Sequence, residues 1–131
     1  LDRTIRTIMR RTGFDHIPVI ANRLEPTGGD RWRLTSPHSA PDGACSSGTC
    51  KCRVAAKQPR PLTLLFGDGR SDYCLAGEAD LVLAKSGLAA HCRQARIPHH
   101  AVTDFAEAAA CLEAVLAGAP LPHQPEDKIN G

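Results

Sequence analysis

Short apolar runs alternate with helix-like segments through the second half of this chain. The runs cover residues 62–66, 81–84 and 100–102, and each is followed by a stretch with helical spacing of apolar side chains. The last helix is expected to begin at Asp104, with Glu107 three residues later as in a capping box. Strands that alternate with helices predict parallel crossovers, and therefore a layered α/β sheet.

The first half of the chain has a less regular pattern. A short amphipathic helix is expected to stop at Gly13, and the run 17–21 reads as a buried strand. Residues 31–34 alternate between polar and apolar side chains, as in a half-exposed strand. Together with the turn that precedes them, they favour a small antiparallel excursion of the chain. The segment 36–50 is rich in Ser, Pro, Gly and Cys and is expected to be a loop, with a helix starting at Lys51.

Length and charge limit the classes of function. The chain has 131 residues, 16 of them basic and 14 acidic, so its formal charge of +2 does not favour nucleic acid as a partner. No apolar stretch approaches the roughly 20 residues that cross a bilayer. We therefore expect a cytoplasmic protein with no membrane partner, one domain over residues 1–118 and a tail over 119–131.

Two aspartates lie four residues apart directly after the run 62–66, in the stretch Gly67-Asp68-Gly69-Arg70-Ser71-Asp72. The carboxyl ends of strands are where open α/β sheets bind ligands, and carboxylate oxygens there suit Mg²⁺. The stretch lacks the third glycine of a dinucleotide fingerprint and the Gly-Lys-Ser/Thr of a phosphate loop. The alternative to a metal site is an ordinary turn at Asp68, with Asp72 capping the next helix.

The same stretch resembles the haloacid dehalogenase-like phosphatases, in the branch that contains phosphoserine phosphatase and methylthiopentenyl-phosphate phosphatase. That branch carries a Gly-Asp-Gly-x-Ser/Asn-Asp element at a strand end, which residues 67–72 match, and a lysine upstream, where Lys51 stands. The segments 79–85 and 104–105 look like the closing strands and helix of the family. The resemblance extends over residues 1 to about 117.

The resemblance implies a three-layer Rossmann-like core with a mostly parallel sheet, here incomplete. It also implies a Mg²⁺-dependent phosphomonoesterase that acts on a small phosphorylated metabolite through an aspartyl-phosphate. By the match, Asp68 binds Mg²⁺, Asp72 is a second ligand or supports the first, and Lys51 contacts the phosphate and the nucleophile. Gly69 is expected at the substrate. Asn22 is a further candidate for lining the site, although a turn-forming asparagine is the simpler alternative.

One departure from the family is as informative as the agreements. The Asp-x-Asp motif that supplies the family's nucleophile does not occur in these residues, so this chain alone is expected to be inactive. We therefore expect a fragment whose partner is the missing amino-terminal part of the same protein. Its incomplete parallel sheet would expose an apolar edge, which favours a homodimer or aggregation.

A competing constellation of His38, Cys45, Cys50 and Cys52 favours a different class of protein. Thiolates and imidazole suit zinc, although the Cys-x₄-Cys-x-Cys spacing is not a standard knuckle and a disulfide is also open. The alternative function is thus a non-catalytic binding or interaction module, stabilised by zinc through Cys45, Cys50 and Cys52. A pseudoenzyme that acts as a partner subunit is a third alternative.

Overall fold

The computed structural model describes residues 1–120 apart from 42, 44, 46 and 59–61. The chain divides into two compact units, Leu1–Val54 and Ala55–Gly131, which are described separately. Most of the predicted tail lies outside the described residues, and the expected single domain stays a prediction.

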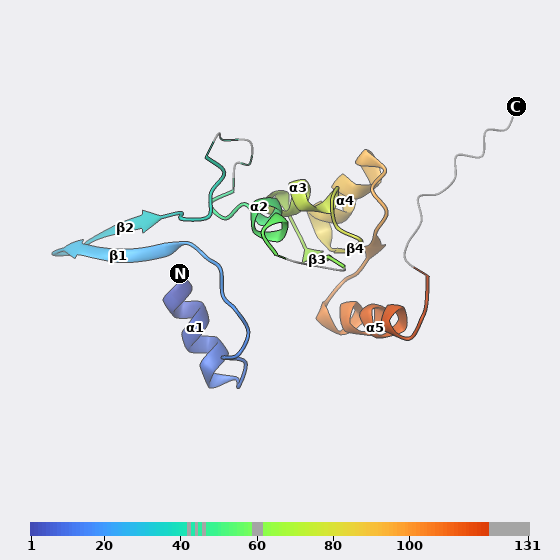
Figure 1. Ribbon diagram of the computed structural model, residues 1–131, viewed down its shortest axis with the longest axis horizontal. Coiled ribbons are helices and arrows are strands. Elements are labelled where there is room, and N and C mark those ends of the chain that lie inside the picture. Colours follow the sequence, from blue (N-terminus) through green and yellow to red (C-terminus); the bar gives the residue numbers. More distant parts are fainter. Residues whose placement is uncertain (42, 44, 46, 59–61, 121–131) are drawn as a thin grey trace, which may run out of the picture. The chain divides into compact units, whose positions relative to one another are not determined.

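A parallel sheet forms the centre of the second unit. Its three strands are β3 (Leu64–Gly67), β4 (Leu81–Ala84) and β5 (His100–Ala101). They pair in the order β3-β4-β5, with both pairs parallel (Figure 1). Among the described residues, β3 is therefore an edge strand that pairs with β4 alone. The α/β class with a parallel sheet, predicted from the alternation of runs, is confirmed.

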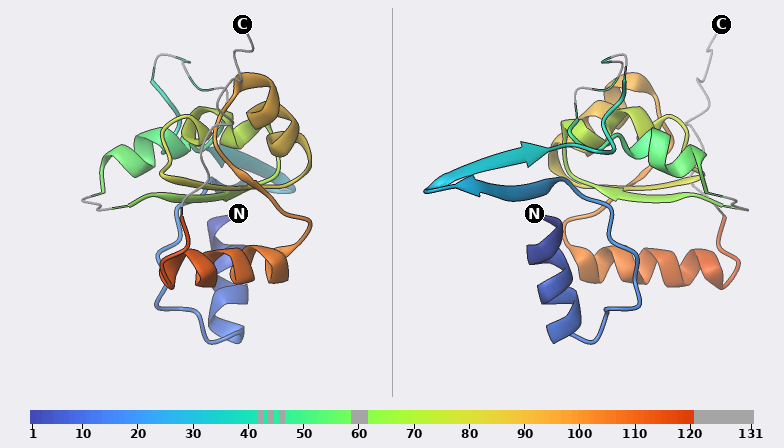
Figure 2. Two further views of the ribbon diagram at one scale, coloured as in Figure 1. Left: turned by 90° about the vertical axis from the view of Figure 1, so that its right-hand side faces the viewer. Right: turned by 60° about the vertical axis from the view of Figure 1, so that its left-hand side comes forward.

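Helices cover both faces of this sheet. They are the 3₁₀ turn Arg70–Asp72, α3 (Tyr73–Ala76), α4 (Ser86–Ala95) and α5 (Phe105–Leu116). One face packs α3 and α4 around the buried side chains of Leu65, Val82 and Leu88, and the other packs α5 around Leu81 and Leu83 (Figure 2). The three layers agree with the Rossmann-like core that the phosphatase resemblance implies.

The central strand explains why its sequence is apolar at every position. All four residues of β4 are buried, because helices cover both faces and strands flank both edges. The helix α3 after β3 is short, since it ends at Ala76 and Gly77 follows as its cap. The helix α4 ends at Ala95, and the cap residue Arg96, with a left-handed φ of 56°, terminates it.

The start of α5 carries the predicted cap in a modified form. The Asp104 carboxylate accepts a hydrogen bond from the Glu107 N–H at 2.9 Å, as expected. The Glu107 carboxylate, however, accepts from the N–H and the hydroxyl of Thr103, each at 2.8 Å. These two hydrogen bonds from Thr103 lower the pKa of Glu107.

We expect the Glu107→Gln variant to be less stable than the wild type at neutral pH, and the difference to shrink in acid. The folded-state pKa lies below the unfolded value, so this stabilisation is present above the unfolded pKa and is lost as pH falls through the folded pKa. Urea midpoints measured from neutral to acidic pH test this. Glu113→Gln, an exposed carboxylate on the same helix, is the control, and a difference independent of pH would contradict the expectation.

The first unit consists of a helix, a hairpin and a loop. Its elements are α1 (Asp2–Arg11), β1 (Arg23–Gly28), β2 (Arg31–Thr35) and α2 (Lys51–Ala56), the last of which runs into the second unit. The strands β1 and β2 pair antiparallel, which confirms the predicted excursion (Figure 1). The helix predicted to start at Lys51 is also confirmed.

The predicted buried strand over 17–21 is wrong. These residues are not in a strand, and Ile17 and Ile20 are 44% and 40% exposed. The reason is pairing, because a strand needs a neighbour for its main-chain hydrogen bonds. The chain has a neighbouring strand only from Arg23 onward, where it pairs with β2. The turn at Gly28 and Gly29, both with positive φ, brings β2 alongside.

No helix in the part of the chain that the structure describes combines the length and the apolar character needed to cross a bilayer.

Candidate functional site

An acidic turn projects from the carboxyl end of β3. Asp68, directly after the strand, has an exposed side chain, whereas Asp72 is only 1% exposed. The Asp72 Oδ2 atom accepts hydrogen bonds from the main-chain N–H groups of Asp68 at 3.1 Å and Gly69 at 3.2 Å. The buried carboxylate therefore holds the backbone of the turn, and the exposed one is left facing outward.

Gly67 is required where the turn leaves the strand. A Cβ atom on this residue would lie 2.5 Å from Cγ and 2.6 Å from Oδ2 of Asp72. Real Cβ contacts do not become this short, and the Asp72 side chain is buried and hydrogen-bonded. The absence of a side chain at Gly67 is what allows the carboxylate to reach under the turn.

The start of α4 holds the turn from the neighbouring strand. The Lys85 N–H donates to the Gly67 carbonyl at 2.9 Å, and the Leu88 N–H donates to the Asp68 carbonyl at 3.1 Å. The Tyr73 hydroxyl donates to the Gly87 carbonyl at 3.3 Å. Together these bonds fix the position of the turn against two helices and make it a rigid part of the sheet edge.

Lys85 is a basic residue at this edge that the sequence reasoning did not select. Lys85 comes directly after Ala84, the last residue of β4, and Asp68 comes directly after Gly67, the last residue of β3. Gly67 and Ala84 are register partners in the parallel pair. The two charged residues therefore leave adjacent strands at the same end of the sheet. The sequence feature that could have identified Lys85 is its position directly after an apolar run that forms a strand.

The donor set fits a divalent ion at Asp68 better than at Asp72. Mg²⁺ in phosphate-handling sites is held by one or two carboxylates, with water and phosphate oxygens filling the other positions. Asp68 offers an exposed carboxylate, whereas one Asp72 oxygen is already engaged with two main-chain donors. Asp72 is thus suited to supporting the turn that carries the ligand.

Comparison with known proteins finds curated phosphatases that are similar in sequence to this chain. The chain is 30% identical over 111 residues to polyol phosphate phosphatase PYP1 of Saccharomyces cerevisiae, across 78% of this chain and 46% of the yeast protein. It is 36% identical over 77 residues to 2-hydroxy-3-keto-5-methylthiopentenyl-1-phosphate phosphatase of Geobacillus thermodenitrificans, across 56% of this chain and 34% of that protein. These relatives indicate the haloacid dehalogenase-like phosphatase branch.

A further phosphatase of the same name from Geobacillus kaustophilus is 32% identical over 101 residues, across 67% of this chain and 46% of that protein. No protein-family model matches the chain. The haloacid dehalogenase-like phosphatase resemblance carried by residues 67–72 is thereby confirmed. The chain spans less than half the length of the curated relatives it matches.

The other residues that the phosphatase resemblance selects lie in both units. Lys51 is the first residue of α2, and its role beside Asp68 stays a prediction. Gly69 lies in the acidic turn, with extended backbone and open space where a side chain would be. The Asn22 side-chain oxygen accepts from the Thr49 hydroxyl at 3.2 Å, and its main-chain carbonyl accepts from the Asp2 N–H at 3.0 Å. Asn22 thus joins segments of the first unit, and its role at the substrate stays a prediction.

Two cysteines of the alternative zinc constellation, Cys45 and Cys50, have sulfurs within 4.8 Å of each other, whereas Cys52 is disulfide-bonded. The Cys50 and Cys52 sulfurs are 3.8 Å apart. Hydrogen bonds from the main chain and side chain of Ser47, and a weaker one from Cys50, lower the pKa of the Cys45 thiol. The main-chain N–H of Cys50 donates to the His38 carbonyl at 2.8 Å, so His38 contacts this cluster through its backbone.

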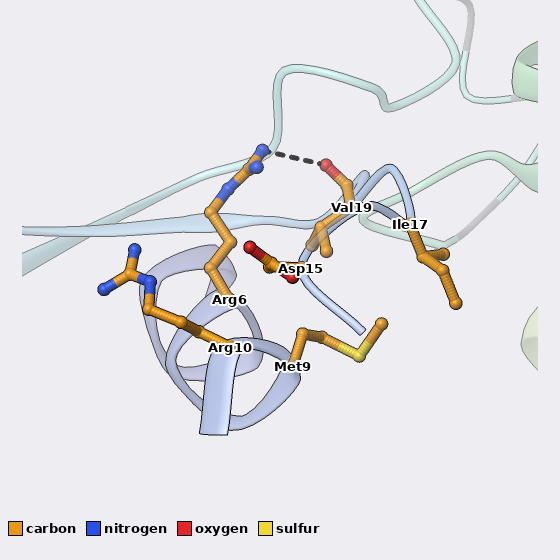
Figure 3. A pocket seen from close by; sticks show the side chains of 6 residues that line it. All are labelled: Arg6, Met9, Arg10, Asp15, Ile17 and Val19. Carbon is orange, nitrogen blue, oxygen red and sulfur yellow. Dashed lines mark hydrogen bonds between the residues drawn. The ribbon is translucent and has the colours of Figure 1, made fainter. Parts of the chain in front are cut away.

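A small pocket lies between α1 and the segment that follows it (Figure 3). It is lined by Arg6, Met9, Arg10, Asp15, Ile17 and Val19. The Arg6 guanidinium reaches across to donate to the Val19 carbonyl at 3.1 Å. This bond ties the irregular segment to the helix, which gives Arg6 a structural role in the first unit.

Proposed function

We propose that residues 1–118 are the carboxyl-terminal part of the core of a Mg²⁺-dependent phosphomonoesterase that acts on a small phosphorylated metabolite. One observation carries the proposal: an exposed carboxylate, Asp68, stands at the carboxyl end of a parallel strand, on a turn fixed by the buried Asp72. The relatives' names support it, since a polyol phosphate and a methylthiopentenyl phosphate are both small phosphate esters.

Phosphoryl transfer depends mainly on positioning and on charge stabilisation. Mg²⁺, when bound, would neutralise charge on the phosphate. Asp68 would bind the ion, Asp72 would keep the Asp68 backbone in place, and the Lys51 ammonium would act as a point charge on the phosphate. Lys85 is a second cation at the same sheet edge as Asp68.

The nucleophile would come from outside these residues, because no Asp-x-Asp occurs in the sequence. An aspartate carboxylate would attack phosphorus and release the substrate alcohol, and water would then hydrolyse the aspartyl phosphate to inorganic phosphate. The fragment interpretation follows from this requirement.

The test compares residues 1–131 alone with the same residues extended by an upstream strand that carries Asp-x-Asp, taken from the parent reading frame. We expect only the extended protein to hydrolyse p-nitrophenyl phosphate, to lose activity in EDTA and to regain it with Mg²⁺. Hydrolysis by residues 1–131 alone, or an extended protein that folds and shows no Mg²⁺-dependent activity, would overturn the proposal.

We expect Gly69→Ala to leave stability unchanged and to raise the KM of the extended protein. The backbone of Gly69 is extended, a conformation open to any residue, and a Cβ atom there meets no atom within 4 Å. The added methyl group would therefore obstruct only a bound substrate. Urea unfolding and steady-state kinetics measure the two effects, and an unchanged KM would remove Gly69 from the substrate site.

A further inference from the structure

The pocket beside α1 presents charges of both signs and an apolar wall to whatever occupies it. Its volume is about 90 Å³, and the residues that line it all come from α1 and the segment directly after this helix, within the first unit. Two guanidinium groups, one carboxylate and three apolar side chains surround the space (Figure 3). One small ligand there would therefore meet a positive, a negative and an apolar surface.

The positive side of the pocket is formed by Arg6 and Arg10. These residues are four apart on α1 and lie on the same face of the helix, where like charges repel. One nitrogen of Arg6 donates to the Val19 carbonyl at 3.1 Å, which leaves its other N–H groups for a ligand. The Arg10 side chain makes no hydrogen bond or ion pair within the described part of the chain. A carboxylate in the pocket would relieve the repulsion and suits the planar fork of a guanidinium.

Asp15 distinguishes a simple anion from a ligand with two charges. Its side chain lines the same pocket, yet no ion pair joins it to either arginine among the residues that the structure describes. In the view of Figure 3 its carboxylate lies between the two guanidinium groups and the Ile17 side chain. This carboxylate would repel a ligand that carries negative charge alone, and it would accept hydrogen bonds from an ammonium group. The charges together favour a zwitterion.

The apolar side of the pocket indicates what else the ligand carries. It is formed by Met9, Ile17 and Val19. Ile17 is 44% exposed, so a ligand methyl group packed against it would remove apolar surface from water. The small volume favours a short aliphatic chain over an aromatic ring.

We propose that this pocket binds a free α-amino acid with a short aliphatic side chain. Arg10 and the remaining N–H groups of Arg6 hold its carboxylate, Asp15 holds its ammonium group, and its side chain packs against Ile17. The pocket belongs to the first unit, whereas the acidic turn belongs to the second. The proposal therefore does not depend on phosphatase activity.

The test is an NMR titration of isotope-labelled residues 1–131 with L-valine, followed through the main-chain amide shifts. We expect saturable shifts at residues 6–19 and a millimolar Kd, because the pocket is small and its charged groups are exposed to solvent. Isovalerate lacks the ammonium group of valine, and isobutylamine lacks its carboxylate. Each should bind at least about fivefold more weakly than L-valine, because each loses hydrogen bonds between charged groups that solvent only partly weakens.

Two variants test the charged residues separately. Arg10→Gln and Asp15→Asn should each weaken L-valine binding by at least about fivefold. Arg11→Gln and Asp30→Asn remove the same charges from exposed residues outside the pocket, and should bind as the wild type does. The proposal is overturned if the wild type shows no saturable binding of L-valine, if isovalerate binds as tightly as L-valine, or if the Arg10 and Arg11 variants bind equally.

Discussion

Replacing Asp68 by asparagine is expected to lower kcat/KM of the extended protein by at least about 100-fold and to raise the Mg²⁺ concentration needed for half-maximal activity. Asparagine keeps the size of the side chain but removes the charge that attracts the divalent ion. The fold should be unaffected, because Asp68 is exposed and the contacts that hold the turn come from its main chain. Steady-state kinetics over a Mg²⁺ titration measure the effect.

Glu78→Gln is the control for this experiment. Glu78 is also an exposed carboxylate, but it lies between α3 and β4, at the opposite end of the strands from the acidic turn. We expect its kinetics and its Mg²⁺ dependence to match those of the wild type. Equal losses in the two variants would mean that general surface charge is responsible, and full activity in Asp68→Asn would remove Asp68 from the site.

Replacing Gly67 by alanine should destabilise the protein by about 2–3 kcal/mol, the upper part of the range for overpacking a buried position. The new methyl group would meet the Asp72 carboxylate at 2.5 Å from Cγ, and the short, buried side chain has little room to move. Its displacement would also break the hydrogen bonds to the N–H groups of Asp68 and Gly69. Urea unfolding should show the loss as a lower midpoint, and activity of the extended protein should fall with it.

Gly77→Ala offers a matched glycine in the same unit. A Cβ atom there meets nothing within 4 Å, and its φ of −75° suits any residue. We expect a neutral or slightly stabilising change, because alanine restricts the unfolded chain. If Gly67→Ala were as stable as Gly77→Ala, the close packing of Asp72 beneath the turn would be refuted.

Local patterns predicted the second unit well because its elements are defined by neighbouring residues. The run 81–84 is apolar at all positions and is a strand with both faces covered. Asp104 was predicted as a helix cap and accepts the expected hydrogen bond. The predicted alternative role of Asp72 as the cap of the next helix is not seen, since its side chain makes no cap hydrogen bond to α3 and instead holds the backbone of the acidic turn before it.

What the pattern could not show depends on partners distant in the sequence. The run 17–21 has the composition of a strand, but no neighbouring strand pairs with it in the described part of the chain. Lys85 escaped notice because only the register of β3 with β4 places it level with Asp68. The convergence of Cys45 with Cys50 likewise depends on how the loop folds, which composition does not determine.

The outer edge of β3 gives the acidic turn a further property. Main-chain donors and acceptors along this side of the strand have no strand neighbour among the described residues, and Leu64 beside them is 41% exposed. An unpaired strand edge of this kind can form main-chain hydrogen bonds with another extended segment. A segment that docks in parallel would end level with Asp68, so an edge that would favour association of the isolated chain would also place an incoming residue beside the carboxylate.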